Sequence, residues 1–102
     1  MPRESETKPV RIGVAWFDRE QWLRLTEVVP NRNELDDTFQ QWERNAKKTL
    51  EDLERRRQLV EKVPIKVDEL LAWCTLRGLT PNGKARSEYV IELMQKKYET
   101  KP

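Results

Sequence analysis

The chain has 102 residues, which is the length of one domain, because a second hydrophobic core would have too few residues to fill it. Charged residues make up 37% of the chain, but 20 Lys and Arg nearly balance 18 Asp and Glu, so a net charge of only +2 does not hold the chain open. Because the chain has only one Cys, it cannot form a disulfide framework or a multi-cysteine metal site. Because it has no His, it lacks the commonest general base.

The first predicted element is a strand that follows a polar tail. Residues 1–8 show no apolar periodicity and predict a disordered tail. Apolar side chains then recur at every second position, at Val10, Ile12, Val14 and Trp16. A period of two with β-branched residues predicts a strand over residues 10–16.

Asp18 predicts the start of the first helix. Its carboxylate can accept the backbone N–H of Gln21, and the Gln21 side chain can reach back in a capping box. Phe17 and Trp22 flank this cap at the spacing of a hydrophobic staple. Pro30 ends the helix, because proline lacks the N–H that a helix interior needs.

The second predicted helix is the longest element and runs from residue 35 to residue 57. Its apolar stripe recurs at three- and four-residue spacing, at Leu35, Phe39, Trp42, Ala46, Leu50 and Leu53. We interpret this stripe as packing on the domain's own sheet rather than in a coiled coil. The acidic residues Glu34, Asp36 and Asp37 precede Phe39, and we expect Asp36 or Asp37 to cap the helix rather than to hold a metal ion.

A second strand is predicted over residues 60–67, where valine and isoleucine alternate with lysine. Pro64 cannot donate to a ladder, which predicts either an edge strand or a proline nitrogen that points toward solvent. The two helices between the strands permit either a parallel crossover or an antiparallel return.

Two further helices complete the predicted fold. Asp68 is expected to cap the third helix, Glu69–Arg77. Gly78 then stops it in the left-handed conformation, with Leu79 folding back on Cys74. A Thr-Pro-Asn-Gly turn leads into the fourth helix, whose apolar face is Ala85, Tyr89, Val90, Leu93 and Met94.

These elements predict a single α+β domain over residues 9–97, with two short strands and four helices in the order β-α-α-β-α-α. Residues 98–102 are predicted to be a flexible C-terminal tail. Two strands alone are marginally stable, so either the helices cover them or another chain adds strands.

Motifs that resemble catalytic or cofactor sites have simpler structural explanations. Residues 78–85 have the glycine and lysine spacing of a P-loop, but Ala85 stands where a hydroxyl would bind magnesium, and Pro81 removes a backbone donor. Cys74 lies on a strongly apolar helix, and the chain has no histidine to activate it. We therefore expect no enzymatic activity, no catalytic residue, no metal site and no cofactor.

The last helix pair resembles the SAP-type helix-loop-helix, a module that binds DNA. The matching positions are Arg77, Gly78, Leu79, Gly83, Lys84, Val90 and Leu93. The resemblance implies a nucleic-acid interface, in which Arg77, Lys84 and Arg86 are the expected phosphate contacts. The pI of about 8.8 is only mildly basic, so nucleic-acid binding is the alternative function rather than the leading one.

Four segments resemble a family of short bacterial proteins with no assigned function. These segments are residues 11–16, 37–42, 68–74 and 83–87. The resemblance implies no activity, partner or site.

The leading interpretation is a cytoplasmic protein-interaction or structural domain that assembles with itself. A two-stranded sheet leaves the apolar first strand with a bare edge, which natural proteins seldom leave unprotected. A twofold dimer is expected to use this edge or the stripe of the long helix, with contacts from Val10, Ile12, Val14, Leu35, Phe39 and Trp42. The alternative is a monomer that the last two helices cover. No membrane partner is expected, since no apolar run approaches the roughly 18 residues of a span or forms a signal peptide.

Overall fold

The computed structural model describes residues 11–98 and confirms the predicted fold class. The elements are β1 (Arg11–Trp16), α1 (Arg19–Val28), a 3-10 turn (Arg32–Glu34), α2 (Phe39–Arg55), β2 (Leu59–Pro64), α3 (Val67–Arg77) and α4 (Gly83–Tyr98). Over residues 11–98 the fold is α+β, with four helices and two strands in the order β-α-α-β-α-α. The predicted tail 1–8 lies outside the described residues, and of the predicted tail 98–102 only Tyr98 is described, at the end of α4.

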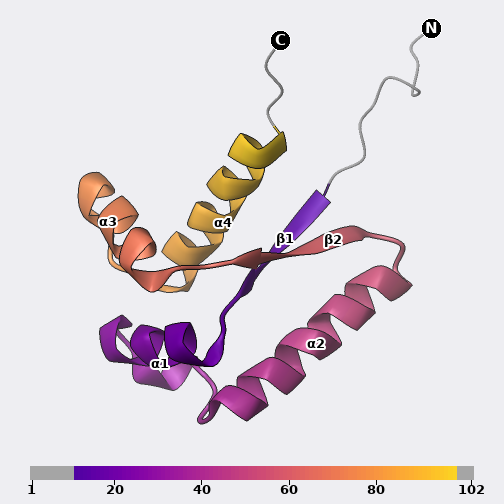
Figure 1. Ribbon diagram of the computed structural model, residues 1–102, viewed down its shortest axis with the longest axis horizontal. Coiled ribbons are helices and arrows are strands. Elements are labelled where there is room, and N and C mark those ends of the chain that lie inside the picture. The colour runs from indigo at the N-terminus through magenta and orange to yellow at the C-terminus, as the bar shows by residue number, and fades with distance from the viewer. Residues whose placement is uncertain (1–10, 99–102) are drawn as a thin grey trace, which may run out of the picture.

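The two strands form a parallel sheet, which resolves the alternative that the sequence left open. The register pairs Arg11 with Leu59 at one end and Trp16 with Pro64 at the other. Helix α2 lies on one side of the strands, and α3 and α4 lie on the other (Figure 1). The sheet is therefore a thin layer between helices.

Alternation along β1 divides its side chains between these two helical layers. A Cβ atom built on Gly13 would meet Met94 of α4 and Val63 of β2, so Gly13 faces α4. Trp16 instead contacts Trp42 of α2, with ring centroids 5.2 Å apart. Because successive side chains of a strand point to opposite faces, Ala15 lies on the α4 side with Gly13.

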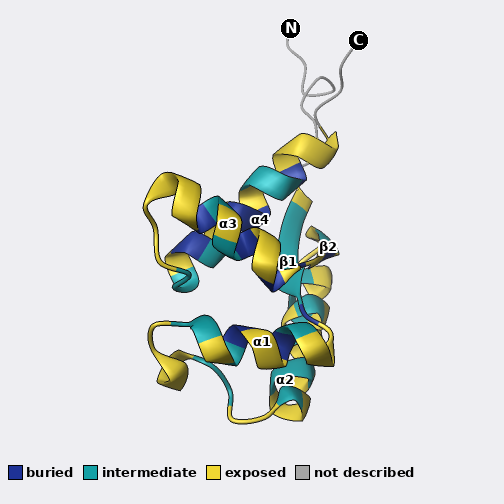
Figure 2. Ribbon diagram, turned by 60° about the vertical axis from the view of Figure 1, so that its left-hand side comes forward, coloured by how far each residue is buried: buried dark blue, intermediate teal, exposed yellow. Residues whose placement is uncertain are grey.

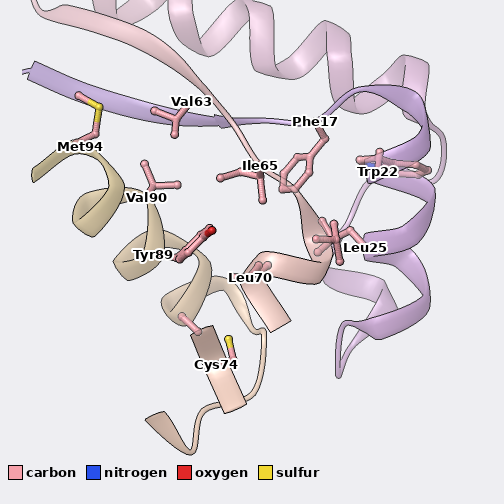
Figure 3. Packing of buried hydrophobic residues seen from close by; sticks show 12 residues of the cluster. Phe17, Trp22, Leu25, Val63, Ile65, Leu70, Cys74, Tyr89, Val90 and Met94 are labelled. Carbon is pink, nitrogen blue, oxygen red and sulfur yellow. The ribbon is translucent and has the colours of Figure 1, made fainter. Parts of the chain in front are cut away.

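The hydrophobic core lies on the side of α1, α3 and α4. Figure 3 shows it, and its buried members are Phe17, Trp22, Leu25, Val63, Ile65, Val67, Leu70, Cys74, Ala85, Tyr89, Val90 and Met94. Helix α2 contributes no fully buried residue, and its apolar stripe is only half-buried (Figure 2). The coverage of the sheet is therefore less complete on the α2 side.

Several predicted helix boundaries are confirmed. The Asp18 carboxylate accepts the N–H of Gln21 at 2.8 Å and begins α1. Gly78 ends α3 with a φ of 66°, and the N–H of Leu79 bonds to the carbonyl of Cys74 at 2.9 Å. These boundaries depend on residues only a few positions apart, which is why the sequence predicts them.

The predicted cap of the long helix is wrong. Neither Asp36 nor Asp37 caps α2, because Thr38 does so with its hydroxyl oxygen, which accepts the N–H of Gln41 at 3.1 Å. The helix also begins four residues later than predicted. The guanidinium of Arg32 donates to the carbonyls of residues 35, 36 and 37 at 3.3, 2.8 and 3.0 Å, which holds this segment out of the helix.

The predicted start of the third helix and the end of the second strand are also wrong. Helix α3 begins at Val67, two residues before the prediction, and β2 ends at Pro64 rather than at residue 67. Asp68, the predicted cap, lies inside α3, and no side chain caps the start of this helix. Instead, the N–H of Val67 bonds to the side-chain oxygen of Gln21 at 2.7 Å. The Gln21 side chain therefore does not complete the predicted capping box with Asp18.

Candidate functional site

A groove of about 1020 Å³ lies beside β1 and is the candidate site; we call it the β1 groove. Its lining residues are Arg11, Ile12, Gly13, Val14, Ala15 and Phe17 from the β1 segment, Leu25, Leu35 and Trp42, and Gly83, Arg86, Ser87, Val90, Ile91, Met94, Gln95 and Tyr98 of α4. The α4 members recur every three or four positions, so one face of that helix forms a wall. This wall is about 22 Å long at 1.5 Å per residue, which makes the groove an elongated channel.

One edge of β1 is open along this groove. The carbonyl of Trp16 accepts the N–H of Ile65 at 3.0 Å, so the polar groups of Trp16 point toward β2. In a parallel ladder the N–H and C=O groups of alternate residues point to opposite edges, and those of Gly13 and Ala15 therefore point away from β2. Within residues 11–98 no third strand joins the sheet. The groove thus presents strand hydrogen-bonding groups that have no strand partner.

The outer edge of β2 differs from that of β1. Pro64 pairs in register with Trp16, and by the same alternation its nitrogen lies on the outer edge, away from β1. Proline has no N–H to donate there, and exposed Lys62 adds a charge to this strand. The prediction that Pro64 marks an edge strand is confirmed. Of the two outer edges of this sheet, only that of β1 keeps all of its backbone N–H donors.

The charged residues that line the groove are both cations. The guanidinium of Arg11 lies 4.8 Å from the centre of the Tyr98 ring, and the Arg86 guanidinium donates to the carbonyl of Pro81 at 2.9 Å. Burial lowers the pKa of Arg86, and the nearby Glu34 carboxylate opposes this shift. No carboxylate is among the described residues that line the groove. The groove is therefore apolar in its middle and positively charged where Arg11 and Arg86 lie.

A small ionic cluster lies beside Arg11 and fixes the end of α4. Glu61 of β2 accepts hydrogen bonds from the Lys97 ammonium at 2.6 Å and from the Tyr98 hydroxyl. These bonds lower the pKa of Glu61, and the carboxylate raises the pKa of Lys97. Two cations, Arg11 and Lys97, surround one carboxylate, so this end of the groove keeps an excess of positive charge.

The structure brings together most of the residues that the sequence assigns to self-association. Ile12, Val14, Leu35 and Trp42 all line the β1 groove. Phe39 packs on the Trp42 ring with centroids 5.7 Å apart, but it is not a lining residue. Val10 lies outside the described residues.

The sequence analysis missed the contribution of α4 to this site. Ile91 is 57% exposed and lines the groove, although the predicted apolar face of the helix does not include it. An apolar residue directly after Val90 and outside the core stripe was the available signal. It could have indicated a second apolar face on this helix.

The structure does not gather the three expected phosphate contacts on one face. Arg77 pairs with Glu92 at 3.1 Å, and its guanidinium lies 4.5 Å from the centre of the Trp73 ring. Lys84 is exposed, whereas Arg86 lines the groove. Residues two positions apart on a helix point in different directions, so Lys84 and Arg86 do not lie side by side on α4.

Comparisons with protein-family models, with curated proteins and with solved structures find no match. Among residues 11–98, no group of three or more His, Cys, Asp and Glu side chains is placed to hold a metal ion. Cys74 is buried, and burial raises the pKa of its thiol. None of the helices in the described part of the chain is long and apolar enough to cross a membrane.

Proposed function

We propose that this chain is a non-catalytic protein-interaction domain that binds an extended polypeptide as an added strand on β1. The observation that carries the proposal is the open edge of β1, where Gly13 and Ala15 line the groove and direct their backbone groups away from β2. In strand addition, main-chain hydrogen bonds supply affinity, and pockets for alternate side chains supply specificity.

The walls of the groove support this mode of binding. Val90, Ile91 and Met94 provide apolar surface on α4, Trp42 provides it on the α2 side, and Leu35 adds to the lining. A strand laid along β1 would therefore meet apolar side chains on both of its faces. Among residues 11–98 the lining includes no carboxylate and no cysteine, and the sequence contains no histidine, so the site favours binding over acid–base or thiol chemistry.

The test uses proline to block the outer edge of β1. Ala15→Pro removes an N–H that points away from β2, so the β1–β2 ladder keeps its hydrogen bonds. Displayed random peptides of about ten residues would be selected on the unchanged protein and their affinities measured by fluorescence anisotropy. We expect the selected peptides to bind the Ala15→Pro variant at least about tenfold more weakly.

Two controls make this test decisive. Leu76→Ala changes an apolar residue on α3 that is 83% exposed and lies outside the groove, so peptide affinity is expected to stay unchanged. Ile91→Asp places a charge on the α4 wall and is expected to weaken binding even if Ala15→Pro fails to fold. Recovery of no peptide, or equal binding by folded Ala15→Pro and Ile91→Asp variants, would overturn the proposal.

Self-assembly would use the same edge with a second copy as the partner. Sedimentation equilibrium at micromolar concentration distinguishes the two cases. A dimer that Ala15→Pro dissociates would assign the groove to self-association. A single species of 12.3 kDa that binds peptides would assign it to another protein.

A further inference from the structure

We infer that the occupant of the β1 groove is an extended segment of another protein, apolar in its middle and acidic at both ends. This inference rests on the proposed function and names its partner class. It follows from three features of the groove: where its cations lie, how close α4 comes to β1, and how long the channel is.

The two lining cations lie toward opposite ends of the groove. Arg11 begins β1 and contacts Tyr98 at the end of α4, so α4 runs antiparallel to β1. Arg86 precedes Tyr98 by 12 residues, or about 18 Å along the helix axis. An extended chain covers that length with about six residues at roughly 3.3 Å each. Carboxylates about six residues apart in a bound strand would therefore each meet an arginine.

A second copy of the chain does not match this pattern of charge. Two β1 strands paired antiparallel about a twofold axis would place the start of each strand beside the end of the other. Arg11 of one copy would then approach Arg86 of its partner, and like charges across an interface disfavour association. No carboxylate is among the described lining residues; Glu61 near Arg11 and Glu34 near Arg86 lie outside the lining and offset only part of this repulsion.

The position of α4 also opposes pairing of two β1 strands. A Cβ on Gly13 would lie only 2.7 Å from Met94, so α4 packs directly on β1. Paired strands lie about 4.8 Å apart, whereas packed helices need about 8–10 Å between their axes. A twofold axis perpendicular to the sheet would place both α4 helices on the same face, over adjacent strands. A single extended segment carries no helix and avoids this collision.

The residues on either side of the described range lack the required chemistry. Residues 1–10 contain only Met1, Val10 and two prolines as apolar side chains, and residues 99–102 are Glu-Thr-Lys-Pro. Neither segment supplies the alternating apolar side chains that Val90, Ile91 and Met94 on the α4 wall would contact.

Two synthetic peptides with the same core test the inference. One is acetyl-Glu-Glu-Val-Thr-Val-Ile-Val-Glu-Glu-amide, and the other has lysine at the four glutamate positions. At about 50 mM salt we expect the acidic peptide to bind at least about tenfold more tightly than the basic one. Arg11→Glu and Arg86→Glu are each expected to reduce or reverse this preference. Lys84→Glu makes the same charge change on α4 outside the groove and is expected to preserve it.

The outcomes separate this inference from the proposed function. If both peptides bind equally and Ala15→Pro abolishes both, strand addition stands and the acidic partner is wrong. If neither peptide binds but displayed peptides of other composition do so in an Ala15-dependent way, the inference is again wrong. A dimer that Ala15→Pro dissociates would replace the proposed occupant with a second copy. Absence of any Ala15-dependent ligand would overturn both proposals.

Discussion

Gly13 of β1 lies against Met94 of α4 so closely that a side chain at position 13 has no room. A Cβ atom there would lie 2.7 Å from Met94 Cγ and 2.9 Å from a methyl group of Val63. The absence of a side chain thus lets α4 approach the strand and form the wall of the β1 groove.

Gly13→Ala is expected to destabilise the domain, because the added methyl group overpacks the contact with Met94 and Val63. The expected loss is about 1–3 kcal/mol in the free energy of unfolding, measured by urea denaturation. Gly83→Ala is the matched control, since its Cβ would meet no atom nearer than 3.8 Å. In helix α4 that control is expected to leave stability unchanged or raise it by up to about 1 kcal/mol. Equal stability of Gly13→Ala and the unchanged protein would contradict the close approach.

The side chain of Gln21 joins the first helix to the third. Its oxygen accepts the N–H of Val67 across a sequence separation of 46 residues. Gln21→Ala would leave this partly buried N–H without its partner, at an expected cost of about 1–3 kcal/mol. Gln41→Ala removes a similar bond to the exposed N–H of Asp37 and is expected to cost less, because water can replace the lost acceptor. Thermal unfolding of both variants tests the difference.

The Glu61 cluster predicts a loss of stability in acid. Its hydrogen bonds from Lys97 and Tyr98 hold the folded-state pKa of Glu61 below the ordinary value of 4.5. A group whose pKa is lowered by folding stabilises the protein above its unfolded pKa and loses that contribution as pH falls through the folded pKa. We expect the melting temperature to fall below about pH 4.5 and Glu61→Gln to flatten this decline. Glu88→Gln, which alters an exposed carboxylate elsewhere on α4, is expected to retain the original slope.

The thiol of Cys74 should be unreactive in the folded protein. Its residue is only 2% exposed, and burial raises the pKa of the thiol, which lowers the fraction of reactive thiolate. Labelling with a chromogenic disulfide reagent at neutral pH is expected to be slow in buffer and fast in denaturing urea. Rapid labelling without urea would contradict this expectation, because it would show that α3 opens readily or that the Cys74 thiol is accessible.

The sequence predicted the elements whose signals are local. Alternation around Val14 indicated β1, Asp18 indicated the start of α1, and Gly78 indicated the end of α3. Each signal depends on side chains within about four positions, because caps and turns are formed by near neighbours. These predictions agree with the structure because each signal comes from residues that lie close together in the sequence.

The two predicted helix starts that were wrong have different causes. The start of α2 depends on Arg32, three to five positions from the carbonyls that it binds, whereas the start of α3 depends on Gln21, 46 positions from Val67. The Arg32 guanidinium bonds to the backbone carbonyl of Leu35, which keeps α2 from beginning there. The Gln21 side-chain oxygen accepts the N–H of Val67, which lets α3 start at Val67. Periodicity alone placed Leu35 on the helix and Val67 in the strand. Because Gln21 lies 46 positions before Val67, the residues around Val67 give no sign of this contact.

The open edge of β1 was expected from the sequence, because each strand of a two-stranded sheet has one edge that pairs with no other strand. The parallel pairing, the close approach of α4 at Gly13 and the placement of Ile91, Arg11 and Arg86 along one groove were decided only by the tertiary structure. These relationships join the start of the chain to its last helix, and residue patterns that repeat every two to four positions contain no information about which distant elements meet. The sequence by itself determined which segments form strands and helices, whereas the packing of α4 on β1 determined that they enclose a groove.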